Sequence, residues 1–142
     1  MRLTQKVLAE IIKNQRGQIV FVTSLAGKMG FPNLSTYSAT KFGIEGFAEA
    51  VRSEVTNQGI DITVLRPGVT DTEFFEVAEM TDFADAMKQE GKIHSPKDIA
   101  DFLLDKLPKK PNELTYGRDK WFIKLLPFLP HNMRLKILSL IS

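Results

Sequence analysis

A short continuous apolar run, Ile19–Val22, constrains the fold of this chain more than any other feature. A run of this length without polar alternation indicates a strand buried on both faces of a parallel sheet. A helix-length segment at residues 36–57 and a second strand at Ile60–Leu65 follow it. A helix beginning at Ser95, where serine, proline and an acid stand in capping order, precedes a strand at Glu113–Tyr116. The alternation of strands and helices predicts right-handed crossovers and an α/β sheet of three parallel strands.

The two helices that flank the first strand carry further information. Apolar residues recur at helical spacing through residues 2–14, which predicts an amphipathic helix. In the 36–57 helix a stripe of small residues runs along one side: Ala39, Gly43, Gly46 and Ala50. Glycine destabilises a helix by about 1 kcal/mol relative to alanine. We therefore expect this side to pack very closely against another element.

Length and composition exclude several classes of protein. A chain of 142 residues is long enough for one compact domain. The absence of cysteine excludes disulfides, thiol nucleophiles and cysteine-based zinc sites, and the two histidines lack ligand-like spacing, so no metal site is expected. Charged residues interrupt residues 1–16, so we do not expect a signal peptide there. No apolar run is long enough to span a membrane. We expect a cytoplasmic protein without a nucleic-acid partner.

The distribution of charge divides the chain into two parts. Residues 1–117 hold 14 Lys and Arg against 16 Asp and Glu, whereas residues 118–142 hold 5 Lys and Arg against 1 Asp. We expect the first part to be the α/β domain and the second to be a basic, apolar extension. The extension has the composition of a peripheral membrane contact, or it docks on the body or a second subunit, which we favour. Co-sedimentation with liposomes, with residues 118–142 deleted as the control, separates the two.

Tyr37 and Lys41 form a pair with acid–base potential. Four residues apart on a helix, their side chains point the same way, and an ammonium beside a phenol favours the phenolate. Such a pair acts as a tunable proton donor and acceptor. Tyr116 and Lys120 share this spacing, so the spacing alone decides nothing. The context of the two tyrosines differs. Tyr37 is preceded by Ser24, whose hydroxyl stands at the carboxyl end of a predicted strand, where open α/β sheets bind ligands, and Tyr116 has no such hydroxyl before it. We interpret Tyr116 as structural.

Three blocks of sequence, in this order and spacing, resemble the short-chain dehydrogenase/reductase family. They are Gly17–Gly27, Tyr37–Lys41 and Arg66–Thr72. The resemblance is good for residues 1 to about 106 and loose beyond them. It implies the C-terminal part of a Rossmann-like, doubly wound parallel sheet. It also implies an NAD(P)-dependent oxidoreductase that interconverts an alcohol and a ketone or aldehyde.

The family's pattern implies a role for each matching residue. Ser24 would hydrogen-bond the substrate oxygen where charge develops. Tyr37 would donate the proton in reduction and accept it in oxidation, and Lys41 would bind the nicotinamide ribose and favour the tyrosine's phenolate. The cofactor, NAD or NADP, would contact Tyr37 and Lys41 and, in addition, a set of residues after the second strand: Pro67, Gly68, Val69, Thr70 and Thr72.

The family's glycine-rich phosphate loop has no counterpart in this sequence, since neither G-x-G-x-x-G nor T-G-x-x-x-G-x-G occurs. We therefore expect the N-terminal nucleotide-binding half to be missing, together with the residue that distinguishes NAD from NADP. The Ile19–Val22 strand would then expose an unpaired edge. We predict no turnover by residues 1–142 alone. An in-frame glycine-rich half encoded upstream of Met1 would identify a truncated enzyme.

The substrate and the partners are less constrained. Residues 72–94 occupy the family's substrate lid and are rich in apolar side chains: Phe74, Phe75, Met80, Phe83 and Met87. These side chains either cover the core, which we favour, or admit a lipophilic alcohol or ketone such as a steroid, a retinoid or a long-chain acyl ketone. The family commonly assembles through two helices, here residues 2–14 and 36–57, so we expect a homo-oligomer.

Two other functions compete with the oxidoreductase. The chain is alternatively a non-catalytic remnant that associates with a homologous subunit through its retained helices. A hydrolase built on Ser24 is disfavoured, because the surrounding residues do not form G-x-S-x-G and no histidine precedes it.

Overall fold

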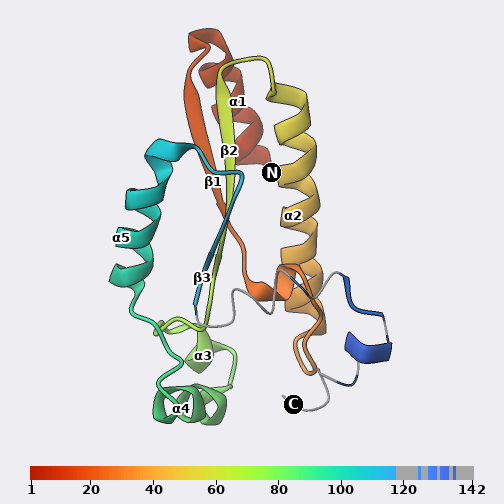
Figure 1. Ribbon diagram of the computed structural model, residues 1–142, viewed down its shortest axis with the longest axis vertical. Coiled ribbons are helices and arrows are strands. Elements are labelled where there is room, and N and C mark those ends of the chain that lie inside the picture. The colour runs from red at the N-terminus through yellow and green to blue at the C-terminus, as the bar shows by residue number, and fades with distance from the viewer. Residues whose placement is uncertain (118–124, 126–127, 131, 135, 137–142) are drawn as a thin grey trace.

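Three parallel strands form the centre of the molecule (Figure 1). The computed structural model describes residues 1–117, 125, 128–130, 132–134 and 136. In it β1 (Gly17–Val22), β2 (Ile60–Pro67) and β3 (Glu113–Tyr116) lie in the order β1-β2-β3, with both pairs parallel. The predicted α/β sheet is thereby confirmed. The predicted extension at 118–142 falls largely outside the described residues.

The longer helices lie close to their predicted positions. α1 (Arg2–Asn14) is as predicted, whereas α2 (Ser35–Val55) begins one residue earlier and ends two residues earlier than expected. α5 (Pro96–Lys106) begins at the predicted cap, where Ser95 Oγ accepts hydrogen bonds from the next two available N–H groups at 3.1 and 3.3 Å. The remaining helical segments are short: η1 (Leu25–Gly27), α3 (Phe74–Val77), α4 (Thr81–Gln89) and η2 (Leu107–Lys109).

Helices cover both faces of the sheet. α2 and part of α1 pack on one face, where they enclose a core with the residues of β2 that point the same way, among them Ile62 and Val64. α5 packs on the other face around Leu65, Ile99 and Leu114. Because alternate residues of β2 serve the two cores, the central strand is buried nearly throughout. This is the arrangement of a doubly wound sheet.

β1 differs from its prediction in burial. It was expected to be buried on both faces, yet its residues are of intermediate exposure and Val22 is 53% exposed. The physical reason is its position at the edge of the sheet. Among the described residues β1 pairs with β2 alone, in a register from Gly17–Ile60 to Val22–Leu65. The expected unpaired apolar edge is therefore present.

The stripe of small residues on α2 also differs from its prediction. Gly43, Gly46, Ala39 and Ala50 are all exposed, and a Cβ placed at either glycine would meet no atom within 4 Å. The side of α2 that packs on the sheet is instead the one that carries Ala48, Val51 and Val55. The prediction that this stripe packs closely against another element is therefore wrong for the described part of the chain.

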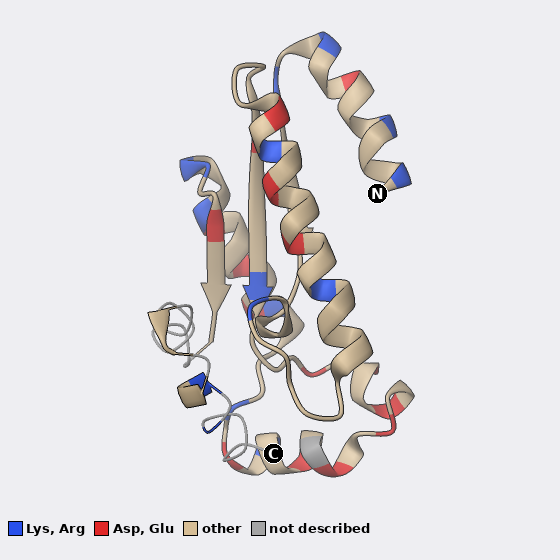
Figure 2. Cartoon of the chain, turned by 90° about the vertical axis from the view of Figure 1, so that its right-hand side faces the viewer, with Lys and Arg blue, Asp and Glu red and all other residues tan. Residues whose placement is uncertain are grey.

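Charged residues are spread along the helices rather than gathered in one block (Figure 2). Basic positions recur on α1, and α2 carries both signs of charge, at Lys41, Glu45, Glu49, Arg52 and Glu54. Within the part of the chain that the structure describes, no helix combines the length and the apolar character needed to cross a membrane.

Candidate active site

The carboxyl ends of β1 and β2 and the first turns of α2 surround a cavity of about 290 Å³. Open parallel sheets bind their ligands at this end of the strands. Residues from these elements and from α3 line the cavity, and most of them are apolar: Thr23, Ser24, Leu25, Ala26, Phe31, Leu34, Tyr37, Pro67, Gly68, Val69, Thr70, Thr72, Phe74 and Phe75. All but one of the predicted site residues are therefore brought together on one cavity.

Ser24 is the second residue after β1, following Thr23. Its backbone is extended, and its Oγ accepts a hydrogen bond of 3.2 Å from the N–H of Ala26 at the start of η1. The serine thus caps this turn, and it also lines the cavity. A hydroxyl that accepts from the backbone keeps its own proton available for a second partner. Ser24 can therefore donate a hydrogen bond into the cavity.

Tyr37 and Lys41 lie one turn apart on α2. The Nζ of Lys41 is 5.5 Å from the centroid of the Tyr37 ring, so the predicted juxtaposition is present. Lys41 is half-buried, and this burial lowers the pKa of its ammonium. It stands beside Tyr37 rather than among the cavity-lining residues, which distinguishes it from the other predicted site residues. The Tyr37 ring also contacts the ring of Phe74, with centroids 5.1 Å apart.

The loop after β2 is held by hydrogen bonds to its neighbours. The N–H of Gly68 donates to the carbonyl of Tyr116 at 2.8 Å, and Thr70 Oγ1 donates to the carbonyl of Gly68 at 2.9 Å. Thr70 also forms a parallel bridge with His94, and Thr72 Oγ1 accepts from the first N–H of α3 at 3.4 Å. A Cβ at Gly68 would lie 3.2 Å from the Tyr116 carbonyl, so the close approach favours glycine.

Tyr116, the tyrosine of the second Tyr-x-x-x-Lys spacing, lies in β3 and is not among the residues that line the cavity. Its ring contacts those of His94 and Phe102, each with centroids 5.0 Å apart. These contacts agree with its interpretation as a structural residue. Lys120 lies outside the described residues.

Several cavity residues escaped the sequence analysis. Phe31 and Leu34 come from the loop before α2, which has no regular periodicity from which a direction could be inferred. Among the predicted lid residues, Phe74 and Phe75 line the cavity, and their rings stand 5.3 Å apart. For Phe31 and Leu34, the available sequence signal was that large apolar residues stand in a loop rich in glycine, proline and serine.

A parallel sheet covered by helices on both faces, with serine, tyrosine and lysine near the carboxyl ends of its strands, has the architecture of a Rossmann-like fold. The family model described as "short chain dehydrogenase" matches residues 1–82. The chain belongs to the short-chain dehydrogenase family.

Relatives and a solved structure agree with this assignment. The chain is 31% identical over 115 residues to dehydrogenase/reductase SDR family member 7B of Xenopus laevis, covering 79% of this chain and 36% of the relative. It is 33% identical over 117 residues to 3-ketodihydrosphingosine reductase of Dictyostelium discoideum, covering 80% and 35%. A short-chain dehydrogenase from Sphingobium yanoikuyae, solved in complex with NADPH, has the same fold with a TM-score of 0.70 at 19% identity, covering 97% of this chain and 51% of that one. The chain thus spans about a third of the length of these curated relatives.

Proposed function

We propose that this site interconverts an alcohol and a ketone or aldehyde by hydride transfer to or from NAD or NADP. The observation that carries the proposal is the convergence of Ser24, Tyr37 and the 67–70 loop on one cavity. In reduction, Tyr37 Oη gives its proton to the substrate oxygen, and in oxidation it takes the proton back. The Ser24 hydroxyl donates a hydrogen bond to the same oxygen and stabilises the charge that develops there.

The residues around the cavity fit the nicotinamide half of such a cofactor. Lys41 offers an ammonium beside Tyr37, and Pro67, Gly68, Val69, Thr70 and Thr72 offer backbone groups and hydroxyls along one wall. When bound, a nicotinamide dinucleotide supplies or accepts the hydride. Lys41 would orient the ribose and favour the phenolate of Tyr37. The NADPH complex of the Sphingobium yanoikuyae dehydrogenase makes NADPH the first cofactor to test.

The experiment is a turnover assay that follows the absorbance of the reduced nicotinamide with a generic ketone. We expect no turnover by residues 1–142 alone, because the sequence holds no glycine-rich loop for the pyrophosphate. We expect turnover by a longer product of the same gene that includes such a loop. In that product Tyr37→Phe abolishes turnover, whereas the matched control Tyr116→Phe retains it.

Two outcomes would contradict this function. Turnover by the Tyr37→Phe variant at the rate of the unchanged protein would refute the role of Tyr37. Measurable reduction by residues 1–142 alone would refute the predicted inactivity of this chain.

The exposed stripe on α2 supports a homo-oligomer through α1 and α2. Gly43 and Gly46 leave open space on a helix face where glycine has no local advantage. A close helix–helix contact would explain both residues. Gly46→Leu is expected to dissociate the oligomer in light-scattering measurements, whereas Gly30→Leu, at another exposed glycine with open space, leaves it intact. A mass that does not change with Gly46→Leu would contradict this interface.

The same surfaces support a second candidate function, a non-catalytic subunit that associates with a full-length homologue. The chain spans only about a third of its curated relatives, and β1 leaves one edge unpaired among the described residues. Tight binding of NAD(P)H by the chain would favour the enzyme. No binding, together with co-purification of a full-length homologue, would favour the subunit.

We propose a lipophilic substrate for the same cavity, because Leu25, Phe31, Leu34, Phe74 and Phe75 form much of its wall. The Dictyostelium discoideum relative is named for a lipid substrate, 3-ketodihydrosphingosine. Burial of one CH₂ group stabilises by about 0.8 kcal/mol, or about fourfold in affinity. Calorimetry with ketones of increasing chain length should show this increase in affinity for each added CH₂ group. The Phe74→Ser variant should show a smaller increase for each group. An affinity independent of chain length would contradict a lipophilic substrate.

A further inference from the structure

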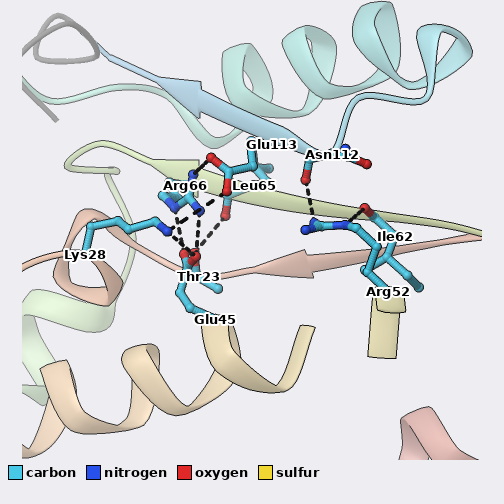
Figure 3. A network of polar contacts seen from close by, with 9 residues as sticks. All are labelled: Thr23, Lys28, Glu45, Arg52, Ile62, Leu65, Arg66, Asn112 and Glu113. Carbon is cyan, nitrogen blue, oxygen red and sulfur yellow. Dashed lines mark hydrogen bonds and ion pairs between the residues drawn. The ribbon is translucent and has the colours of Figure 1, made fainter. Parts of the chain in front are cut away.

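A cluster of polar side chains lies where β1, β2, β3 and α2 meet, next to the cavity (Figure 3). Arg66 is its centre: Nε and Nη2 donate to the two carboxylate oxygens of Glu45 at 2.7 and 2.6 Å, and Nη1 donates to Glu113 at 3.0 Å. Thr23 Oγ1 donates to Glu45 Oε1 at 2.8 Å, and Lys28 Nζ lies 3.5 Å from Glu45 Oε2. Two cations and two carboxylates thus balance in charge.

The arrangement depends on the shape of the guanidinium as well as on its charge. The Arg66 side chain is 3% exposed and that of Glu45 is 10% exposed, so the pair stands largely out of water. The parallel pair of bonds between them fixes both side chains in one geometry. Burial by itself lowers the pKa of Arg66, but the hydrogen bonds and charges of Glu45 and Glu113 raise it overall. Arg66 is therefore charged in the folded protein.

The cluster connects the strand of the serine to the helix of the tyrosine. Thr23 directly precedes Ser24, and Glu45 lies one turn beyond Lys41 on α2. The hydrogen bond from Thr23 to Glu45 therefore ties the end of β1 to α2. Close packing reinforces this tie, because a Cβ at Gly27 would lie 2.9 Å from Glu45 Cγ.

The same cluster connects both of these elements to the proposed nicotinamide loop. Arg66 directly precedes Pro67, the first cavity residue of that loop. Glu45 accepts from both Thr23 and Arg66, so a single carboxylate fixes the end of β1, α2 and the end of β2 relative to one another. None of Lys28, Glu45, Arg66 or Glu113 is among the residues that line the cavity.

We infer that the Glu45–Arg66 pair is a positioning device for the site: it sets where Ser24, the Tyr37 helix and the 67–70 loop stand relative to one another. The inference rests on the proposed function for the meaning of those three segments. The two residues act through others and touch no reacting atom. Catalytic geometry tolerates little displacement, so a loss of this pair acts on the site before it acts on the remainder of the fold.

Arg52 offers a matched control from the same elements. It projects from α2, and its Nε and Nη2 donate to the carbonyls of Ile62 and Asn112 at 3.2 and 2.8 Å (Figure 3). Like Glu45, it ties α2 to β2, and it also binds the carbonyl just before β3, away from the cavity lining. Arg52→Met therefore removes a comparable link without touching the site.

The test is amide hydrogen exchange followed by NMR on the full 142-residue chain, which needs no turnover. Glu45→Gln is expected to lower protection by about tenfold at three site amides, those of Thr23, Gly27 and Gly68, relative to the amide of Val64. Arg52→Met is expected to show the reverse pattern, because Val64 donates to Asn112, whose carbonyl Arg52 also binds. An equal loss of protection at all four amides in both variants would overturn the inference and leave the pair a general stabiliser.

A milder variant covers the case in which Glu45→Gln does not fold. Thr23→Val keeps the shape of the side chain and removes only its hydrogen bonds to Glu45 and Leu65. We expect it to lower protection at Gly27 while Gly68 is unchanged, and unchanged protection at Gly27 would overturn the inference. Because exchange is read without cofactor or substrate, failure of the proposed function would appear in the turnover assay and not in this one.

Discussion

Gly59 lies where the connection between α2 and β2 closely approaches the turn between α1 and β1. It joins α2 to β2 with a φ of 70°, and a Cβ built there would lie 2.1 Å from the backbone oxygen of Gln15. Gln15 belongs to the turn between α1 and β1. Gly59→Ala therefore tests how α1 is attached to the remainder of the fold.

The expected loss of stability has two parts. A non-glycine residue in the left-handed region costs about 1–2 kcal/mol. Real Cβ contacts essentially never fall below 3.0 Å, so one of the two turns must also shift by almost an ångström. Overpacking of this kind costs a further 1–3 kcal/mol, roughly. Gly91→Ala isolates the first part, because Gly91 has a φ of 63° but no atom within 4 Å of its Cβ position.

The assay is urea unfolding followed by far-UV circular dichroism on the unchanged chain and both variants. We expect Gly91→Ala to lower the free energy of unfolding by about 1 kcal/mol and Gly59→Ala to lower it by about 1–3 kcal/mol more. Equal losses in the two variants would refute the reasoning, because they would show that the Gln15 and Gly59 turns do not touch in solution.

Three further predictions concern the core, a helix start and the response to pH. Ile62 in β2 is 2% exposed, so Ile62→Ala should lower the free energy of unfolding, measured in urea, by about 3 kcal/mol, and a loss below about 1 kcal/mol would contradict its burial. Ser95→Ala removes the N-cap of α5 and should lower the free energy of unfolding by about 1 kcal/mol, whereas Ser95→Asp should keep most of the cap's contribution. The hydrogen bond from Arg66 holds the pKa of Glu113 below its ordinary value. Glu113 therefore stabilises fully above the ordinary carboxyl pKa, and this contribution is lost as the pH falls through the lowered folded-state value. Unfolding measured over a series of acidic pH values should show a steeper loss for the unchanged chain than for Glu113→Gln, and parallel curves would contradict the ion pair.

The order and type of the elements could be predicted from the sequence because each has a local signal. Ser95 predicts the start of α5, and the apolar runs predict β1 and β2. The ends were harder to place. α2 stops at Val55, although no glycine follows until Gly59, and β2 continues to Pro67 because the end of a ladder tolerates a residue without an N–H. Whether an apolar strand lies at the centre or the edge depends on its neighbours, so the exposure of β1 has no local signal.

The candidate site was predictable where one motif carries one residue. Ser24, Tyr37 and the 67–70 loop each belong to such a motif, and the structure brings them to one cavity. The Glu45–Arg66 pair was not foreseen, because its members are 21 positions apart and each is unremarkable alone. Its only signal was a charge at Arg66 at the end of a strand that is otherwise buried, since a buried charge requires a partner.

The edge of β1 that is unpaired among the described residues has a consequence for regulation. Within this part of the chain the strand pairs on one side, and just after it the N–H of Thr23 donates to the carbonyl of Leu65 at 2.8 Å. A chain that pairs with the open side would restrain the serine from the second direction. By thermodynamic linkage, a ligand that requires the serine in one place would then strengthen that pairing, and the pairing would strengthen the ligand's binding by the same factor. Pairing at the edge of β1 and binding of a ligand in the cavity would in that way each depend on the other.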